Sequence, residues 1–148
     1  MVRTSSVNTD SKMDSYASNV WDEDRTIQRL GGQRELIQKL VSLFLRDAPK
    51  QISQALQGIE LHDYDFSHVA VHSLKGTSSN FCTMHLESTC AELLEALKNR
   101  DWDESLAIHQ KLVEEYRKIE GPFEEFLKHW ALINHLHNSD NIIIENSS

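Results

Sequence analysis

Helix-breaking and cross-linking residues are scarce in this sequence. Its 148 residues include only five glycines, two prolines and two cysteines. Apolar residues recur at intervals of three and four along most of the chain, so this scarcity predicts a protein that is nearly all helix. Two cysteines, Cys82 and Cys90, are too few for a disulfide framework. Both fall in or beside apolar segments, so we expect free thiols in a reducing cytosol.

Long hydrophobic runs and an excess of basic charge are also missing. No segment approaches the ~20 apolar residues of a membrane-spanning helix, and residues 1–20 contain no apolar stretch that could serve as a signal peptide. The net charge is -8 without a basic stripe, which argues against nucleic acid or an anionic membrane as the partner. We expect a cytoplasmic protein whose partner presents a basic or apolar docking face.

The length suits one domain, which we place at residues 21–137. Residues 1–20 are rich in Ser, Asn and Asp, which predicts a disordered leader or linker, and residues 138–148 form a polar tail. The domain starts with a short helix that ends at Gly31–Gly32. A long helix from Gln33 to about Glu60, bent by a proline at position 49, has its apolar residues at Leu36, Leu40, Leu43, Phe44, Ile52, Ala55 and Ile59.

Three further helices follow. The first contains His72, the second begins after the candidate N-cap Thr83, and the third begins after Asp101 at a sequence that resembles a capping box. Gly121–Pro122 predicts an interruption before a short last helix. The predicted fold class is therefore all-α, an antiparallel four-helix bundle with a short extra helix at each end.

The segment "VHSLKGTSSNF", residues 71–81, has a glycine inside a helical pattern, at a cost of about 1 kcal/mol relative to alanine. On a helical wheel Ala70, Leu74, Thr77 and Phe81 share the side typical of a buried stripe. The opposite side holds His68, His72, Lys75, Gly76 and Ser79. The wheel therefore predicts that the imidazole of His72 faces solvent.

These residue types suit covalent chemistry on a phosphoryl group. A solvent-facing imidazole keeps a nucleophilic nitrogen near neutral pH and can form a covalent intermediate. Lys75, one turn further on, can offset the charge of a phosphoryl group on His72. Gly76 removes the side chain beside the imidazole, so that the active site of a partner can close over the histidine.

"HSLKG", residues 72–76, resembles the His-x-x-Lys-Gly signature of the histidine-containing phosphotransfer domains of multistep phosphorelays, and "TSSN" continues it in the usual small, polar style. Upstream, "IQRLGGQRELIQKLVSLFLRDAPKQI" is similar to the short helix, Gly-Gly turn and long second helix of the bacterial members. The resemblance covers about residues 21–119. It implies a four-helix bundle in which His72 accepts a phosphoryl group from a receiver-domain aspartate and passes it to another receiver, with Lys75 as charge support and Gly76 as clearance.

The resemblance also implies the partners and the cofactor. The partners are receiver domains of response regulators or hybrid histidine kinases, and their acidic pocket supplies Mg²⁺. The chain needs no cofactor of its own. Because it has no Gly-rich nucleotide loop, we expect a relay without ATP-dependent kinase activity.

The sequence departs from the family pattern at Cys82, where the family commonly has a glycine. Either Cys82 adopts a left-handed conformation at some cost, or the helix ends differently.

The receiver-docking surface is less well marked. Apolar residues of the 33–60 helix cover an arc of roughly 200°, wider than the ~100° stripe that a bundle needs. The extra width of this apolar arc has two possible sources. Either the apolar stripe shifts around the helix at the predicted bend, or part of it is a surface on which a receiver docks. In the second case Leu45 and Ile52 are docking candidates, together with Val69, His68 and Ser79 around His72.

Two alternatives of other classes remain open. His68 and His72 are spaced i, i+4 and could share a zinc ion, but a third ligand from His62, Asp63 or Asp65 would have to fold back. A zinc site also leaves the glycine unexplained, and we expect no metal site. In the other alternative the bundle is an adaptor without chemistry, and most of the histidines are solvated surface. The linker-like leader favours the C-terminal domain of a membrane-bound hybrid sensor kinase over a free-standing protein.

Overall fold

The computed structural model describes the backbone of residues 21–147 and the side chains of residues 21–133. The regular elements in this range are all helices: α2 (Glu23–Arg29), α3 (Arg34–Glu60), α4 (Tyr64–Ser79), α5 (Met84–Lys98) and α6 (Trp102–Ser147). None of these described helices is long and apolar enough to cross a membrane. The predicted leader, residues 1–20, lies outside the described residues.

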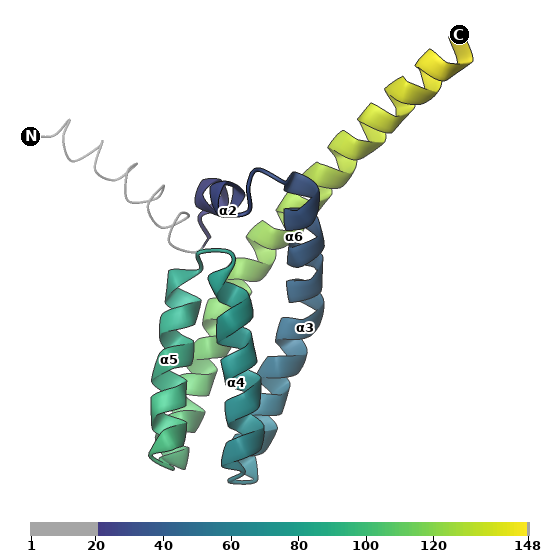
Figure 1. The fold of residues 1–148 in the computed structure, drawn as a ribbon. Helices are drawn as coiled ribbons and strands as arrows, with labels where there is room; N and C mark the ends of the chain where they lie inside the picture. Colours follow the sequence, from purple (N-terminus) through teal and green to yellow (C-terminus); the bar gives the residue numbers. More distant parts are fainter. Residues whose placement is uncertain (1–20, 148) are drawn as a thin grey trace, which may run out of the picture.

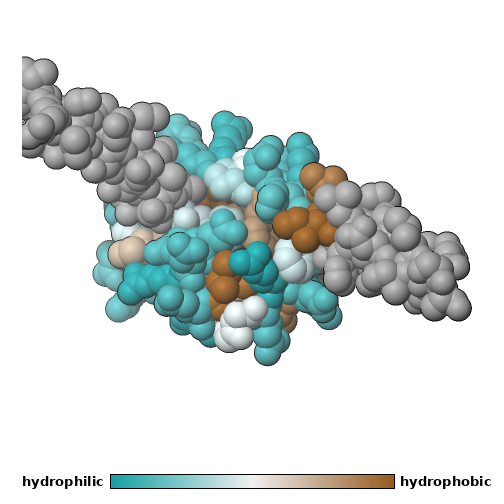
Figure 2. All heavy atoms as spheres, turned by 90° about the horizontal axis from the view of Figure 1, so that it is seen from above, coloured by the Kyte–Doolittle hydropathy of each residue, from teal (hydrophilic) through white to brown (hydrophobic). Residues whose placement is uncertain are grey.

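Helices α3 to α6 form an antiparallel bundle (Figure 1). Each packs against two of the others, because α3 contacts α4 and α6, and α5 contacts the same two helices. The short helix α2 lies at the upper end, near the α4–α5 turn, and this end of the molecule is mainly hydrophilic with small hydrophobic patches (Figure 2). The predicted all-α bundle is confirmed.

An aromatic cluster fills the core at the end that α2 covers. Phe44, Phe81 and Phe123 come from three parts of the chain, and their ring centroids lie 5.0–5.5 Å apart. Trp21 closes the cluster with its centroid 4.6 Å from that of Phe123. Its indole nitrogen donates to the hydroxyl of Thr26, 3.1 Å away. Edge-to-face aromatic packing of this kind adds to the stabilisation from burial alone, so the start of the domain is held against α6.

The apolar stripe of α3 differs in part from the prediction. The residues that face the core are Ile37, Val41, Phe44, Ala48, Ile52, Ala55 and Ile59. Leu36 is 37% exposed, and Leu40 and Leu43 are half-buried. Two adjacent apolar rows run along this helix, and the positions of α4 and α6 decide which row is covered. The helix continues through Pro49, whose side chain is exposed.

The C-terminal region also differs from the expectation. In place of a break at Gly121–Pro122 and a separate last helix, α6 runs as one helix to Ser147 and projects beyond the bundle (Figure 1). Ile119 and Phe123 are buried on both sides of the Gly-Pro pair. Their packing holds the helix in register, since tertiary contacts routinely override weak local preferences.

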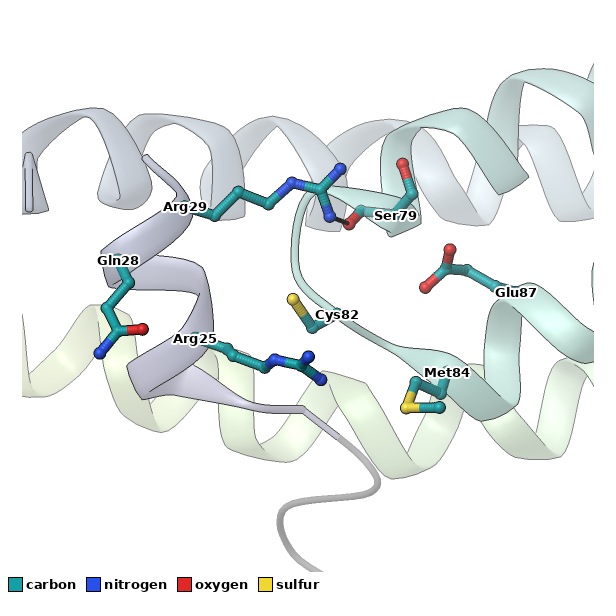
Figure 3. A pocket seen from close by; sticks show the side chains of 7 residues that line it. All are labelled: Arg25, Gln28, Arg29, Ser79, Cys82, Met84 and Glu87. Carbon is teal, nitrogen blue, oxygen red and sulfur yellow. Dashed lines mark hydrogen bonds between the residues drawn. The ribbon is translucent and has the colours of Figure 1, made fainter. Parts of the chain in front are cut away.

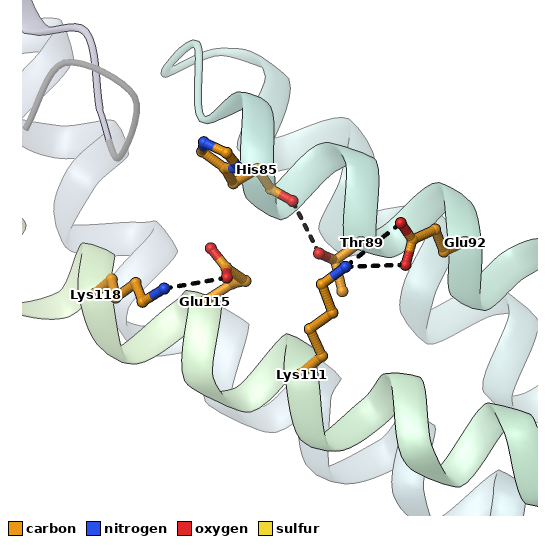
Figure 4. Close-up of polar contacts among 6 residues, drawn as sticks. All are labelled: His85, Thr89, Glu92, Lys111, Glu115 and Lys118. Carbon is orange, nitrogen blue, oxygen red and sulfur yellow. Dashed lines mark hydrogen bonds and ion pairs between the residues drawn. The ribbon is translucent and has the colours of Figure 1, made fainter. Parts of the chain in front are cut away.

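Two ion pairs lie on the outer side of α5 and α6, at exposed or half-buried side chains (Figure 4). Lys111 forms an ion pair with Glu92 across the two helices at 3.2 Å, and Lys118 pairs with Glu115 within α6 at 3.3 Å. Exposed pairs of this type contribute about 0–1 kcal/mol. Apolar burial, and not surface charge, therefore holds the bundle together.

Candidate functional site

His72 lies in the middle of α4 with its side chain exposed to solvent. The helix starts at the N-cap Asp63, whose carboxylate accepts a hydrogen bond from the amide of Phe66 at 3.1 Å. Its inner face consists of Ser67, Ala70, Val71, Leu74 and Ser78. Thr77, predicted to be buried, lies at the edge of that face and its hydroxyl donates to the carbonyl of Ser73. The predicted exposure of His72 is confirmed.

Gly76 leaves open space beside the histidine. A Cβ atom built on this residue would meet no atom within 4 Å, so the glycine is not required for packing against another helix. Its helical backbone is exposed, and no side chain stands between it and solvent. A partner can therefore approach the imidazole from the C-terminal side of α4.

Lys75 is half-buried on the side of α4 that faces α5. There it interacts electrostatically with Glu87. Burial raises the pKa of the Glu87 carboxyl, and the positive charges of Arg29 and Lys75 oppose that rise. The Lys75 ammonium is thus close enough to a carboxylate on α5 to influence its protonation, one turn away from His72.

Three flat rings follow one another along α4 on the histidine side. The rings of Tyr64 and His68 have centroids 5.2 Å apart, and those of His68 and His72 are 5.8 Å apart and nearly parallel, at 9°. The guanidinium carbon of Arg100, from the α5–α6 turn, lies 3.8 Å from the centre of the Tyr64 ring. The spacing of four between the ring residues is a sequence signal that could have indicated this column.

Cys82, the departure from the resemblance, has a φ of 55°, in the left-handed region. The helix also ends differently from its neighbours. Helices α2, α3 and α5 each close with an amide that donates to the carbonyl five residues earlier, whereas at the end of α4 the amides of Asn80, Phe81 and Cys82 donate in succession to carbonyls three residues earlier. The two outcomes that the sequence offered as alternatives therefore occur together. A non-glycine residue in this conformation costs about 1–2 kcal/mol.

The last carbonyls of α4 receive further donors from outside the helix. Thr83 is the N-cap residue of α5, as predicted, but its hydroxyl donates to Ser78 O at 2.8 Å and forms no capping bond to α5. The Arg29 guanidinium, from α2, donates to Ser79 O at 3.0 Å (Figure 3). Because the final carbonyls of a helix have no partner within it, these bonds tie α2 and the α4–α5 turn to the helix that bears His72.

The model of the Hpt domain family matches residues 39–129, more than half of the chain. The chain belongs to the Hpt domain family. Its function is histidine phosphotransfer in a relay, as the sequence resemblance implies. No curated protein matches the chain.

Solved structures of Hpt proteins share the fold. Histidine-containing phosphotransfer protein B from Pseudomonas aeruginosa PAO1 is 18% identical with a TM-score of 0.68, covering 74% of this chain and 95% of its own. The Hpt domain of a sensor hybrid histidine kinase from Shewanella is 17% identical with a TM-score of 0.67, covering 75% and 96%. The maize protein ZmHP2 is 23% identical with a TM-score of 0.70, covering 90% and 99%.

The predicted docking residues of this Hpt domain fall into two groups. Val69 is 64% exposed and lies beside Phe66, which is 41% exposed and was not predicted. His68 and Ser79 are half-buried near His72. Ile52 is wrong as a docking candidate, because it is only 8% exposed and belongs to the core.

The wide apolar arc of α3 has a simple cause. The helix packs against α4 on one side and α6 on the other, so it buries more than a single stripe. Leu45, the other docking candidate on α3, is half-buried and packs against the core. The excess arc is therefore largely interior surface, and the exposed apolar residues near the histidine lie on α4 itself.

Sequence reasoning missed His109, which is 4% exposed on α6. Its Nε2 atom lies 2.8 Å from the carbonyl oxygen of Ile52, so it joins α6 to α3 inside the bundle. It lies three residues before the core residue Leu112, a spacing that could have revealed it. Within the described residues, no three His, Cys, Asp or Glu side chains gather as metal ligands, so the zinc alternative has only the pair His68 and His72.

Proposed function

We propose that His72 is the phosphoacceptor of this Hpt domain, taking the group from a receiver-domain aspartate and passing it to a second receiver. The observation that carries the proposal is the exposed imidazole of His72 beside the unobstructed backbone of Gly76. The buried histidine His109 lacks such access. His72, the histidine of the His-x-x-Lys-Gly pattern, is therefore chemically suited to phosphotransfer.

The step is an in-line displacement at phosphorus. The lone pair of one imidazole nitrogen forms the N–P bond while the P–O bond to the aspartate breaks, and the carboxylate leaves with that electron pair. The proton on the other ring nitrogen stays or passes to solvent. Such a loose transition state needs positioning and countercharge more than covalent help from the protein. Lys75 adds positive charge near the phosphoryl group, and Gly76 gives the receiver room to close.

We propose that the remaining countercharge is the Mg²⁺ held by the acidic pocket of the receiver, and that the chain uses no cofactor of its own. The partners are receiver domains of response regulators or hybrid histidine kinases, in the cytoplasm. The sequence has no Gly-rich nucleotide loop. The domain therefore relays phosphoryl groups without ATP-dependent kinase activity.

The test uses a receiver domain carrying a radiolabelled aspartyl phosphate. The full chain should take up acid-labile label, and His72→Gln should take up none, with a stability change within about 0.5 kcal/mol because the residue is exposed. His129→Gln, an exposed histidine on α6, is the matched control and should label normally. ATP and Mg²⁺ alone should leave the chain unlabelled.

Two outcomes contradict the proposal. Label on the His72→Gln chain would assign the acceptor role to another histidine, with His68 the first to be tested. A wild-type chain that binds receivers but never takes label would support the adaptor alternative instead.

A further inference from the structure

We infer that His68 is a positioning residue that orients the imidazole of His72 for transfer, with Tyr64 and Arg100 as its support. The inference rests on the proposed role of His72. It assigns the column of rings along α4 a function in the reaction, distinct from receiver docking and from metal binding.

The surroundings of His72 are unequal on its two sides. Towards the C-terminus, Gly76 offers no side chain at all, and a Cβ there would contact nothing within 4 Å. Towards the N-terminus, the His68 ring lies 5.8 Å away and 9° from parallel. Side chains on a helix lean towards its N-terminus, so residues i and i-4 meet. The His72 ring therefore leans over His68, the neighbour that can restrict its rotation.

Restricting that rotation matters because the clearance at Gly76 has a cost. An exposed imidazole turns about two side-chain bonds, and only some orientations aim a nitrogen along the line of the breaking P–O bond. Loss of alignment in a near-attack geometry slows a reaction strongly. A flat ring that packs against one face of the imidazole favours a subset of orientations and leaves the opposite side open for the receiver.

The column is anchored at the end away from His72. Tyr64 is half-buried against the core, and its ring contacts both the His68 ring and the Arg100 guanidinium. Arg100 is itself held by hydrogen bonds from Nη1 to the carbonyls of Leu97 and Lys98, at 3.3 and 3.0 Å. A tilted ring pair and a cation–π contact at these distances are attractive. The α5–α6 turn thus supports a ring of α4, which in turn supports His68.

The experiment compares His68→Ala with His68→Phe in the full chain, using a phosphorylated receiver in a rapid-mixing assay. It separates the maximal transfer rate at saturating receiver from the half-saturating concentration. His68→Ala should lower the maximal rate roughly five- to tenfold and leave the half-saturating concentration within about twofold, a change too small to be a lost docking contact. His68→Phe keeps a flat ring and should restore most of the rate. His129→Ala is the control and should match the wild type.

A spectroscopic readout follows the imidazole directly. In the phosphate-free chain, NMR couplings across the first side-chain bond of His72 should move towards rotamer-averaged values in His68→Ala and stay near wild type in His68→Phe. Arg100→Ala, which removes only the far support, should produce a smaller change in both measurements. Circular dichroism and melting temperature confirm that each variant is folded.

Three results overturn the inference. The first is an unchanged maximal rate in His68→Ala, and the second is a change confined to the half-saturating concentration, which would make His68 a docking residue. The third is failure of His68→Phe to restore the rate, because the imidazole itself would then be required. Each can occur while His72 still takes the label, whereas label on a His72→Gln chain defeats the proposed function first.

Discussion

Gly58 and Gly76, both inside helices of this Hpt domain, lie in a packed region and an open region, respectively. A Cβ on Gly58 of α3 would lie 2.7 Å from the backbone nitrogen and Cβ of Ser67, so α3 and α4 approach too closely for any other residue. A Cβ on Gly76 of α4 would meet nothing within 4 Å. Both glycines weaken their helices similarly. The difference teaches that one serves close packing and the other serves access.

The two cysteines divide in the same way. Cys90 is fully buried in α5, where desolvation raises the pKa of its thiol to about 12. Cys82 lies half-buried in the α4–α5 turn, where it lines a depression of about 570 Å³ together with Arg25, Gln28, Arg29, Ser79, Met84 and Glu87 (Figure 3). Packed and open regions should therefore differ in reactivity as well as in tolerance to substitution.

The largest difference should appear in thiol labelling at neutral pH. Cys90 should react with a thiol reagent at least about a hundredfold more slowly than Cys82, because its thiol must first be exposed by opening of the bundle and then deprotonated. Mass spectrometry of the native chain over time measures both rates, and urea should remove the difference. Equal rates in the native chain would mean that α5 opens freely and is not part of a packed region.

A large side chain in the open region should abolish access without unfolding the domain. Gly76→Arg should lower receiver-to-histidine transfer by well over tenfold, since the side chain stands where the receiver must approach, while arginine is a good helix former. Melting temperature and transfer rate are measured on the same preparation. An unfolded variant would indicate that Gly76 is packed after all, and normal transfer by a folded variant would remove its role as clearance.

A single methyl group in the packed region should do the opposite. Gly58→Ala should destabilise the bundle by about 1–3 kcal/mol, because the new Cβ meets the backbone of Ser67 and the two helices must separate. Gly76→Ala is the matched control and should stabilise by up to about 1 kcal/mol. Urea unfolding gives both values. If the two variants shift stability in the same direction, the contrast between the glycines is wrong.

The smallest effect concerns the turn at Cys82. Cys82→Gly should stabilise the domain by about 0.5–1 kcal/mol, since the relief of left-handed strain exceeds the entropy that glycine adds to the unfolded chain. His62 has the same φ of 55°, but its ring stacks on Trp102 at 4.8 Å. His62→Gly should therefore gain less or lose stability in urea unfolding. A loss in Cys82→Gly would show that the thiol makes contacts that outweigh the strain.

Local periodicity was sufficient to predict much of the fold and the centre of the candidate site. The end of α2 at Gly31–Gly32 and the start of α6 after Asp101 depend on residues within one turn of each other. The exposure of His72 follows from the apolar positions of its own helix. Such features need no knowledge of distant residues, because they arise from hydrogen bonds and side-chain spacing along one segment.

Other features depend on how the helices meet. Ile52 became core instead of docking surface because α4 and α6 both cover α3. Helix α6 passed through Gly121–Pro122 because Phe123 packs against Trp21 and Phe81 from distant parts of the chain. The wheel already placed Gly76 on the open side of α4, but the packing role of Gly58 appeared only when the backbone of Ser67 was found against it. Burial is a property of the assembled bundle, since a segment by itself does not specify which neighbours will cover it.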